Sequence, residues 1–125
     1  MKQKIFSMIL CMIFSGASIQ AGKPDLVFDH YHSPAELNQV LKGLSRSHAI
    51  LTDLIEIAAS PGGKPLFMLY IGPEAGNKTK RLPAVLVAAN LEGTVPLASE
   101  AAMFLIKSIL DKPECRQDKG WFILP

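Results

Sequence analysis

The most constraining feature of this chain is an uninterrupted apolar run, residues 83–89, that contains no polar side chain. Such a run predicts a strand covered on both faces, as in the parallel part of an α/β sheet. A short loop, residues 90–94, follows, and a helix with apolar residues along one side is expected to continue to Leu110, before Pro113. A strand, a loop and a helix in this order predict a layered α/β fold.

A second helix is predicted upstream of this run. Ser33 and Glu36 have the spacing of a capping box, with Pro34 at the first helical position. Leucines and a valine then recur at helical spacing, so the helix is expected to extend to about Ser47. His48 lies at its end, where the helix dipole favours a cation, and is interpreted as structural.

The remaining elements are strands. Residues 51–58 and 66–72 flank a turn of Ser, Pro and Gly, which predicts an antiparallel hairpin. Residues 121–124 begin another strand at the end of the given sequence. The fold is therefore expected to be α/β, a three-layer α/β/α sandwich with a mixed sheet, incomplete in this chain, which is interpreted as the amino-terminal part of a longer domain.

The first residues predict an export signal rather than part of the fold. Two lysines precede an apolar core, residues 5–14, that is too short to span a bilayer, and small residues allow cleavage after Ala17 or Ala21. A membrane anchor is the alternative. With residues 1–21 removed, the domain at 22–125 is expected to be secreted or periplasmic, without membrane contact.

Charge and cysteine content exclude several partners. Residues 22–125 carry eleven basic and eleven acidic side chains, so no nucleic acid or anionic membrane partner is expected. The basic side chains of Lys78, Lys80 and Arg81 are interpreted as a solvated loop. Cys115 is the only cysteine after the signal, and one thiol forms neither an internal disulfide nor a zinc site by itself.

Few side chains are candidates for chemistry. His30 and His32 could bind a metal as an H-x-H pair, although a surface or packing role is favoured. Ser60 has no neighbouring His and Asp arrangement, so no nucleophile is expected there. Glu92 is the strongest candidate, because it is a carboxylate in the loop at the carboxyl end of a strand, where ligands gather in open α/β sheets. The alternative is that Glu92 caps the next helix or faces solvent.

Several motifs, in order, resemble the M14 zinc carboxypeptidases. The opening segment YHSPAELNQVLKGL, the turn residues Ser60 and Gly63, the strand PAVLVAA and the terminal WFILP follow the pattern of that family over residues 31–125. In the family the strand leads into a His-Gly-x-Glu-Pro loop and a helix. Matching Gly93 and Pro96 to that loop places Glu92 at the position of the ligand His.

The same alignment places Val95 at the position of the ligand Glu and Glu100 in the first turn of the helix, where an anion is favoured. The resemblance implies an enzyme that removes carboxyl-terminal residues from peptides, with zinc held by this His, this Glu and a later His. Because both positions are replaced, we expect no metal ligand, no cofactor and no catalytic residue in this chain.

The resulting prediction is the amino-terminal portion of a secreted M14-like metallocarboxypeptidase domain, inactive as this chain. Glu92 is the one candidate for substrate contact. The alternative is a non-catalytic module that binds peptides or cell-wall fragments on the same fold. A structural α/β domain whose likeness to the peptidases is accidental is the third hypothesis.

Overall fold

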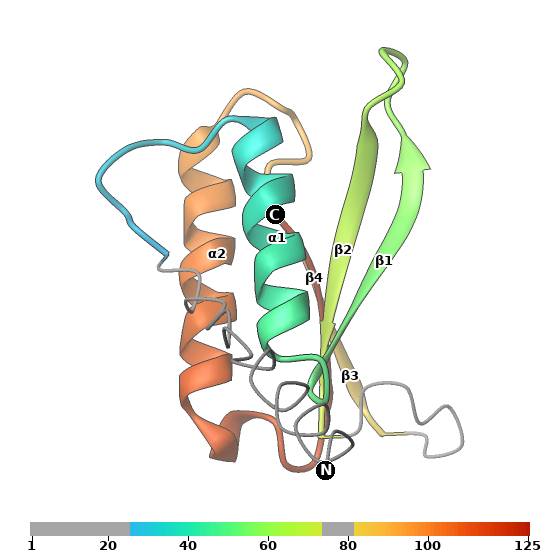
Figure 1. Cartoon of the computed structure of the whole chain (residues 1–125), viewed down its shortest axis with the longest axis vertical. Helices are drawn as coiled ribbons and strands as arrows, with labels where there is room; N and C mark the ends of the chain where they lie inside the picture. The colour runs from blue at the N-terminus through green and yellow to red at the C-terminus, as the bar shows by residue number, and fades with distance from the viewer. Residues whose placement is uncertain (1–25, 74–81) are drawn as a thin grey trace, which may run out of the picture.

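The computed structural model describes residues 26–73 and 82–125 (Figure 1). The predicted export signal and the basic side chains of Lys78, Lys80 and Arg81 lie outside these residues. No helix within the described ranges has both the length and the apolar character needed to cross a membrane. In chain order the elements are α1 (Pro34–Ser47), β1 (Thr52–Ala59), β2 (Pro65–Ile71), β3 (Ala84–Ala88), α2 (Pro96–Asp111), the short 3-10 helix η1 (Pro113–Cys115) and β4 (Gly120–Leu124).

The four strands form one mixed sheet in the order β1-β2-β4-β3. β1 and β2 are an antiparallel hairpin, β2 and β4 are also antiparallel, and β3 and β4 run parallel. The chain leaves β3, passes through α2 and returns as β4, which is the βαβ crossover that parallel strands require. The predicted α/β class, the hairpin and the mixed sheet are therefore confirmed.

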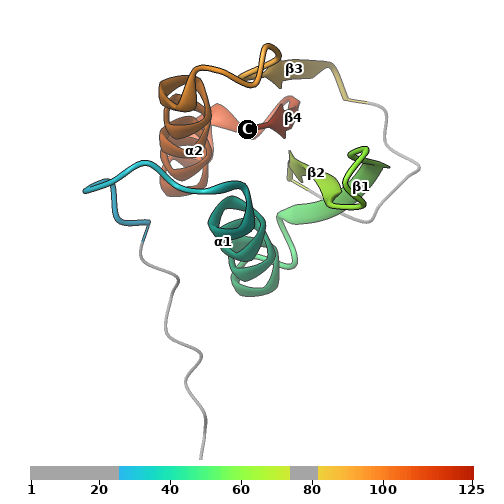
Figure 2. The ribbon, with the colours of Figure 1, turned by 90° about the horizontal axis from the view of Figure 1, so that it is seen from above.

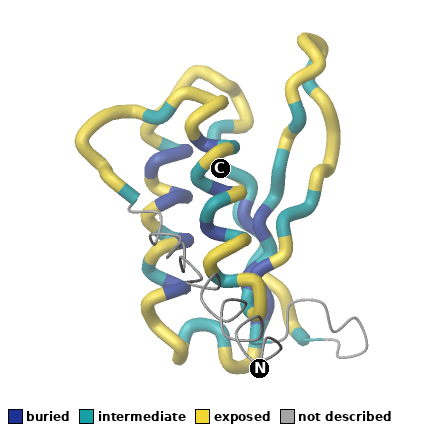
Figure 3. The backbone as a smooth tube through the Cα atoms, in the orientation of Figure 1, coloured by how far each residue is buried: buried dark blue, intermediate teal, exposed yellow. Residues whose placement is uncertain are grey.

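Both helices pack on the same face of this sheet, as the view from above shows (Figure 2). The buried residues lie on α1, α2 and the central strands (Figure 3), and their side chains pack together as the hydrophobic core of the described residues. Burying one large aliphatic side chain contributes about 1.5–3 kcal/mol, so these positions carry most of the packing energy. The fully buried large side chains are Leu41, Leu69, Ile71, Met103, Ile106, Ile109 and Ile123.

The expectation that residues 83–89 are covered on both faces is wrong for the described chain. β3 is the terminal strand of the sheet, and Leu86 remains 68% exposed. Val87 packs toward the core, because alternate side chains of a strand point to opposite faces. The physical reason for the exposure is that α1 and α2 cover one face and no described helix covers the other.

The ends of the elements differ little from the sequence expectations. The capping box at the start of α1 is present, with Ser33 and Glu36 each accepting the other's backbone N–H. α1 ends at Ser47 as expected, and the strands of the hairpin are displaced by one residue. The apolar pattern therefore predicted where the elements lie, and the capping box predicted where α1 begins.

Candidate functional site

The loop between β3 and α2 is held in shape by one side chain, Asn90. Its Oδ1 accepts the backbone N–H of Val95 at 3.1 Å, and its carbonyl oxygen accepts the N–H of Gly93 at 2.8 Å. Both Asn90, at φ 50°, and Gly93, at φ 68°, occupy the left-handed region. Asn and Gly are the residues that adopt this conformation at least cost. Sequence reasoning missed the role of Asn90, although an Asn directly after a strand is a turn signal.

Glu92 lies at the exposed tip of this loop, at the carboxyl end of β3. The N-cap of α2 is Val95, which makes no side-chain capping hydrogen bond, so Glu92 does not cap the helix. Val95 is 49% exposed. The structure therefore places both residues at the end of the strand, where the alignment expected them, and leaves the Glu92 carboxylate in solvent.

The side chains of this loop do not fit a zinc ion. Glu92 offers a carboxylate, and Val95 offers only methyl groups. Within residues 26–73 and 82–125, no group of three or more His, Cys, Asp or Glu side chains is arranged to hold a metal. A protein zinc site takes three or four nitrogen, sulfur or oxygen donors from side chains. The part of the chain that the structure describes does not assemble such a donor set.

Glu100 has a different place from the one expected. It is the fifth residue of α2, in the second turn rather than the first, and it is 9% exposed. Its Oε1 accepts the backbone N–H of His32 at 2.6 Å, and both carboxylate oxygens lie 3.0 Å from Nδ1 of His32. Because Glu100 binds His32, the second turn of α2 faces the segment that leads into α1. Glu100 therefore anchors that segment to α2.

The neighbouring pair of Asp29 and His30 lies at the surface. Nδ1 of His30 is 2.6 Å from Oδ1 of Asp29, and the His30 and His32 rings are 4.8 Å apart. The hydrogen bond to Asp29 raises the pKa of His30, and the same bond lowers the pKa of Asp29. The structure therefore places His32 in a buried hydrogen-bonded pair with Glu100 and His30 in an exposed pair with Asp29.

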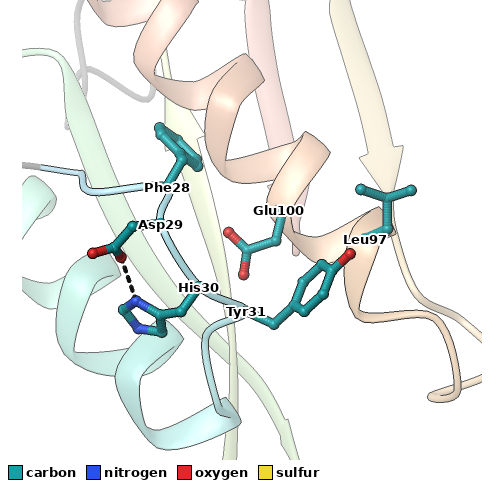
Figure 4. Close-up of a pocket in the computed structure, with 6 residues that line it drawn as sticks. All are labelled: Phe28, Asp29, His30, Tyr31, Leu97 and Glu100. Carbon is teal, nitrogen blue, oxygen red and sulfur yellow. Dashed lines mark hydrogen bonds and ion pairs between the residues drawn. The ribbon is translucent and has the colours of Figure 1, made fainter.

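An open pocket of about 600 Å³ lies between this segment and the first turns of α2 (Figure 4). Aromatic and aliphatic side chains share its wall with the Asp29–His30 pair and the Glu100 carboxylate. The Phe28 ring also packs edge-on against Phe104 at 5.8 Å. The carboxylates in the wall are already engaged by His30 and His32. The lining residues are Phe28, Asp29, His30, Tyr31, Leu97 and Glu100.

The other residues considered from the sequence have structural positions. The Ser60 hydroxyl accepts the backbone N–H of Lys64 at 3.1 Å in the hairpin turn. His48 is the C-cap of α1, with Nδ1 3.2 Å from the carbonyl oxygen of Leu44. Cys115 has a free, half-buried side chain. Its backbone carbonyl oxygen accepts the Trp121 indole N–H at 2.8 Å. None of these three side chains contributes to the loop at the end of β3.

Comparison with known protein families shows which family this fold belongs to. Residues 37–125 match the model of Peptidase_M14, zinc carboxypeptidase. The chain belongs to the M14 zinc carboxypeptidase family. An accidental likeness, the third hypothesis from the sequence, is therefore wrong. The chain is 30% identical over 78 residues to carboxypeptidase E of Caenorhabditis elegans, a match that covers 62% of this chain and 16% of that protein.

Two solved structures share the fold of the described residues. Carboxypeptidase A from Helicoverpa armigera superimposes with a TM-score of 0.72 at 20% identity, over 79% of this chain and 25% of that chain. Thrombin activatable fibrinolysis inhibitor superimposes with a TM-score of 0.67 at 14% identity, over 77% of this chain and 25% of that chain. The chain thus spans a quarter or less of the length of these relatives.

Proposed function

We propose that this chain forms the amino-terminal portion of an M14-like metallocarboxypeptidase domain and does not hydrolyse peptides by itself. The family match and the shared fold support the placement in the domain. The chemistry of the loop after β3 supports the inactivity. A carboxylate and an aliphatic side chain stand at Glu92 and Val95, where the family resemblance calls for an imidazole and a carboxylate.

The test is zinc loading and hydrolysis with the chain after signal removal. We expect substoichiometric zinc by elemental analysis after dialysis and no release of the carboxyl-terminal residue from a model peptide. The double variant Glu92→His/Val95→Glu supplies two donors at the same loop, and should bind zinc at least tenfold more tightly than the parent chain. One zinc per parent chain together with peptide hydrolysis contradicts the proposal.

The second candidate function is a non-catalytic module that binds peptides or cell-wall fragments. Its support is the loop itself, because Asn90 fixes the backbone that presents the exposed Glu92 at the end of the sheet. A preorganised loop loses little entropy on binding. Titration with a peptide and with a muropeptide tests this function. The variant Glu92→Gln should weaken binding, whereas Glu114→Gln, which changes an exposed carboxylate on η1, should not.

We also propose that the protein is exported, with cleavage after Ala17 or Ala21. The basic start and the short apolar core of residues 5–14 support this proposal. Amino-terminal sequencing of the protein recovered from the medium or periplasm tests it. A mature chain that begins at Ser18 or Gly22 is the expected result, and retention of Met1 in a membrane fraction contradicts it.

A further inference from the structure

The pocket between the segment before α1 and the first turns of α2 combines apolar and acidic side chains in one wall. Phe28 and Tyr31 on that segment, and Leu97 on the first turn of α2, line the pocket and are exposed to solvent. Small-molecule sites in proteins are mostly apolar, with a few polar groups, and a volume of about 600 Å³ is within their usual range. The pocket is therefore large enough for a small organic ligand.

The charge of this wall comes from two carboxylates. Asp29 and Glu100 line the pocket together with His30, and no Lys or Arg is among the six lining residues. Because two carboxylates outnumber one imidazole, the lining side chains carry a net negative formal charge at neutral pH whether or not His30 is protonated. Such a wall attracts a cationic ligand and repels an anionic one.

Glu100 has hydrogen-bonding capacity that its protein partner does not use. Its carboxylate accepts the backbone N–H of His32 and faces Nδ1 of the same residue, so one neighbour supplies two donors. An ionised carboxylate can accept about four hydrogen bonds. Figure 4 shows this carboxylate directed from α2 toward the segment that carries Asp29, His30 and Tyr31. A donor group in the pocket can therefore bind Glu100 without displacing His32.

We propose that this pocket binds a small organic cation, an ammonium group attached to an aromatic body. The ammonium donates hydrogen bonds to the Glu100 carboxylate, and the aromatic body packs against Phe28, Tyr31 and Leu97. An ammonium beside aromatic rings also gains cation–π attraction. The inference goes beyond the proposed function, because none of these residues belongs to the loop between β3 and α2.

Other classes of ligand fit this wall less well. A metal ion requires several converging donor side chains, and no group of three or more is present among residues 26–73 and 82–125. A carboxylate or phosphate ligand is repelled by Asp29 and Glu100. A neutral aromatic compound fills the apolar part of the pocket but makes no charge-assisted hydrogen bond with Glu100. The charge of the ligand is therefore the property to vary in a test.

The test is a titration of the chain with three indole compounds that differ in charge, followed by NMR or calorimetry at about pH 8, above the ordinary pKa of an imidazole. Tryptamine is the cation, tryptophol is neutral and indole-3-propionate is the anion. We expect tryptamine to bind with a Kd of about 1 mM, as for a compound of its size. The neutral and anionic compounds should bind about fivefold more weakly or worse. Amide shifts should change at Phe28, Tyr31 and Glu100.

Two variants of the wall and two matched controls locate the site. Glu100→Gln keeps an oxygen for the His32 N–H but removes the negative charge, and should weaken tryptamine binding about fivefold. Tyr31→Ala removes a ring that is 63% exposed, so the fold is retained, and should weaken binding about threefold. Glu114→Gln on η1 and Leu91→Ala, at a 79% exposed position outside the pocket, should leave binding unchanged.

Three results overturn the inference. They are equal affinity for the three indole compounds, no binding of tryptamine at millimolar concentrations, and binding that Tyr31→Ala leaves intact. Should Glu100→Gln fail to fold, the comparison of tryptamine with tryptophol and the Tyr31→Ala variant still decide. Zinc content and peptide hydrolysis report on the proposed function instead. A chain that is zinc-free and inactive but does not distinguish tryptamine from tryptophol thus refutes the cation site while leaving the proposed function in place.

Discussion

At the scale of single residues, the most consequential side chains lie away from the loop that carries the family motif. Glu100 and His32 form a hydrogen-bonded pair whose side chains are 11% and 6% exposed. Removing one partner of a buried pair leaves the other without compensation for its lost hydration. Together these two residues hold the segment before α1 against α2.

We therefore predict that Glu100→Ala lowers the free energy of unfolding by about 1–3 kcal/mol, because it leaves the buried polar groups of His32 without their hydrogen-bond acceptor. The matched control is Glu114→Ala, which removes an exposed carboxylate and should change stability by less than about 0.5 kcal/mol. Urea denaturation followed by circular dichroism measures both. Equal stability of the two variants contradicts a structural role for this pair.

Asn90 provides a second prediction at the residue scale. The variant Asn90→Ala loses the bond to the Val95 N–H and places a Cβ-bearing residue without a local hydrogen bond at φ 50°. Asn90→Gly loses the same bond but adopts this conformation freely. We expect the alanine variant to be about 1 kcal/mol less stable than the glycine variant, measured by thermal or urea unfolding. A glycine variant less stable than the alanine variant shows that the left-handed backbone is not the reason for Asn at this position.

At the scale of elements, the sequence predicted the two α-helices and four strands of the described residues, but not the short helix η1, because the signals of the longer elements are local. Ser33 and Glu36 mark the start of α1 within four residues, and the apolar run of β3 needs no partner to be recognised. The contact between His32 and Glu100 could not be predicted in this way, because the two residues are 68 positions apart. The exposure of β3 was also missed, since it depends on β4 entering the sheet between β2 and β3.

The same distinction applies to the candidate site. The position of Glu92 and Val95 after β3 follows from strand, loop and helix in sequence, and the structure has them there. The conformation of the loop was not predicted, because it depends on a hydrogen bond from the Val95 N–H back to Asn90. A hydrogen bond between two residues five positions apart produces no repeating pattern of apolar residues that could be recognised in the sequence.

The start of α1 provides a prediction about pH. Hydrogen bonds from Ser33 lower the pKa of Glu36 below its ordinary value of 4.5. A carboxyl group with a depressed pKa in the folded state stabilises the protein above its unfolded pKa, and this contribution is lost as pH falls through the folded value. We expect Glu36→Gln to lose less stability than the parent chain between about pH 5 and pH 3. Parallel pH profiles of unfolding for the two proteins contradict this assignment.

At the scale of the whole molecule, the two helices cover one face of the sheet, and β1 carries acidic side chains at one edge. We therefore expect the other edge, formed by β3, to control how the isolated chain associates. An apolar uncharged edge strand is a template for pairing between molecules. We predict that Ala88→Lys, which puts a cation on the edge strand β3, slows aggregation at 37 °C several-fold in light scattering. Glu56→Lys changes a side chain on β1, at the edge that is already protected, and should not slow it. If both lysine variants slow aggregation equally, net charge rather than the edge of β3 controls association, because a general electrostatic effect does not depend on which strand carries the cation.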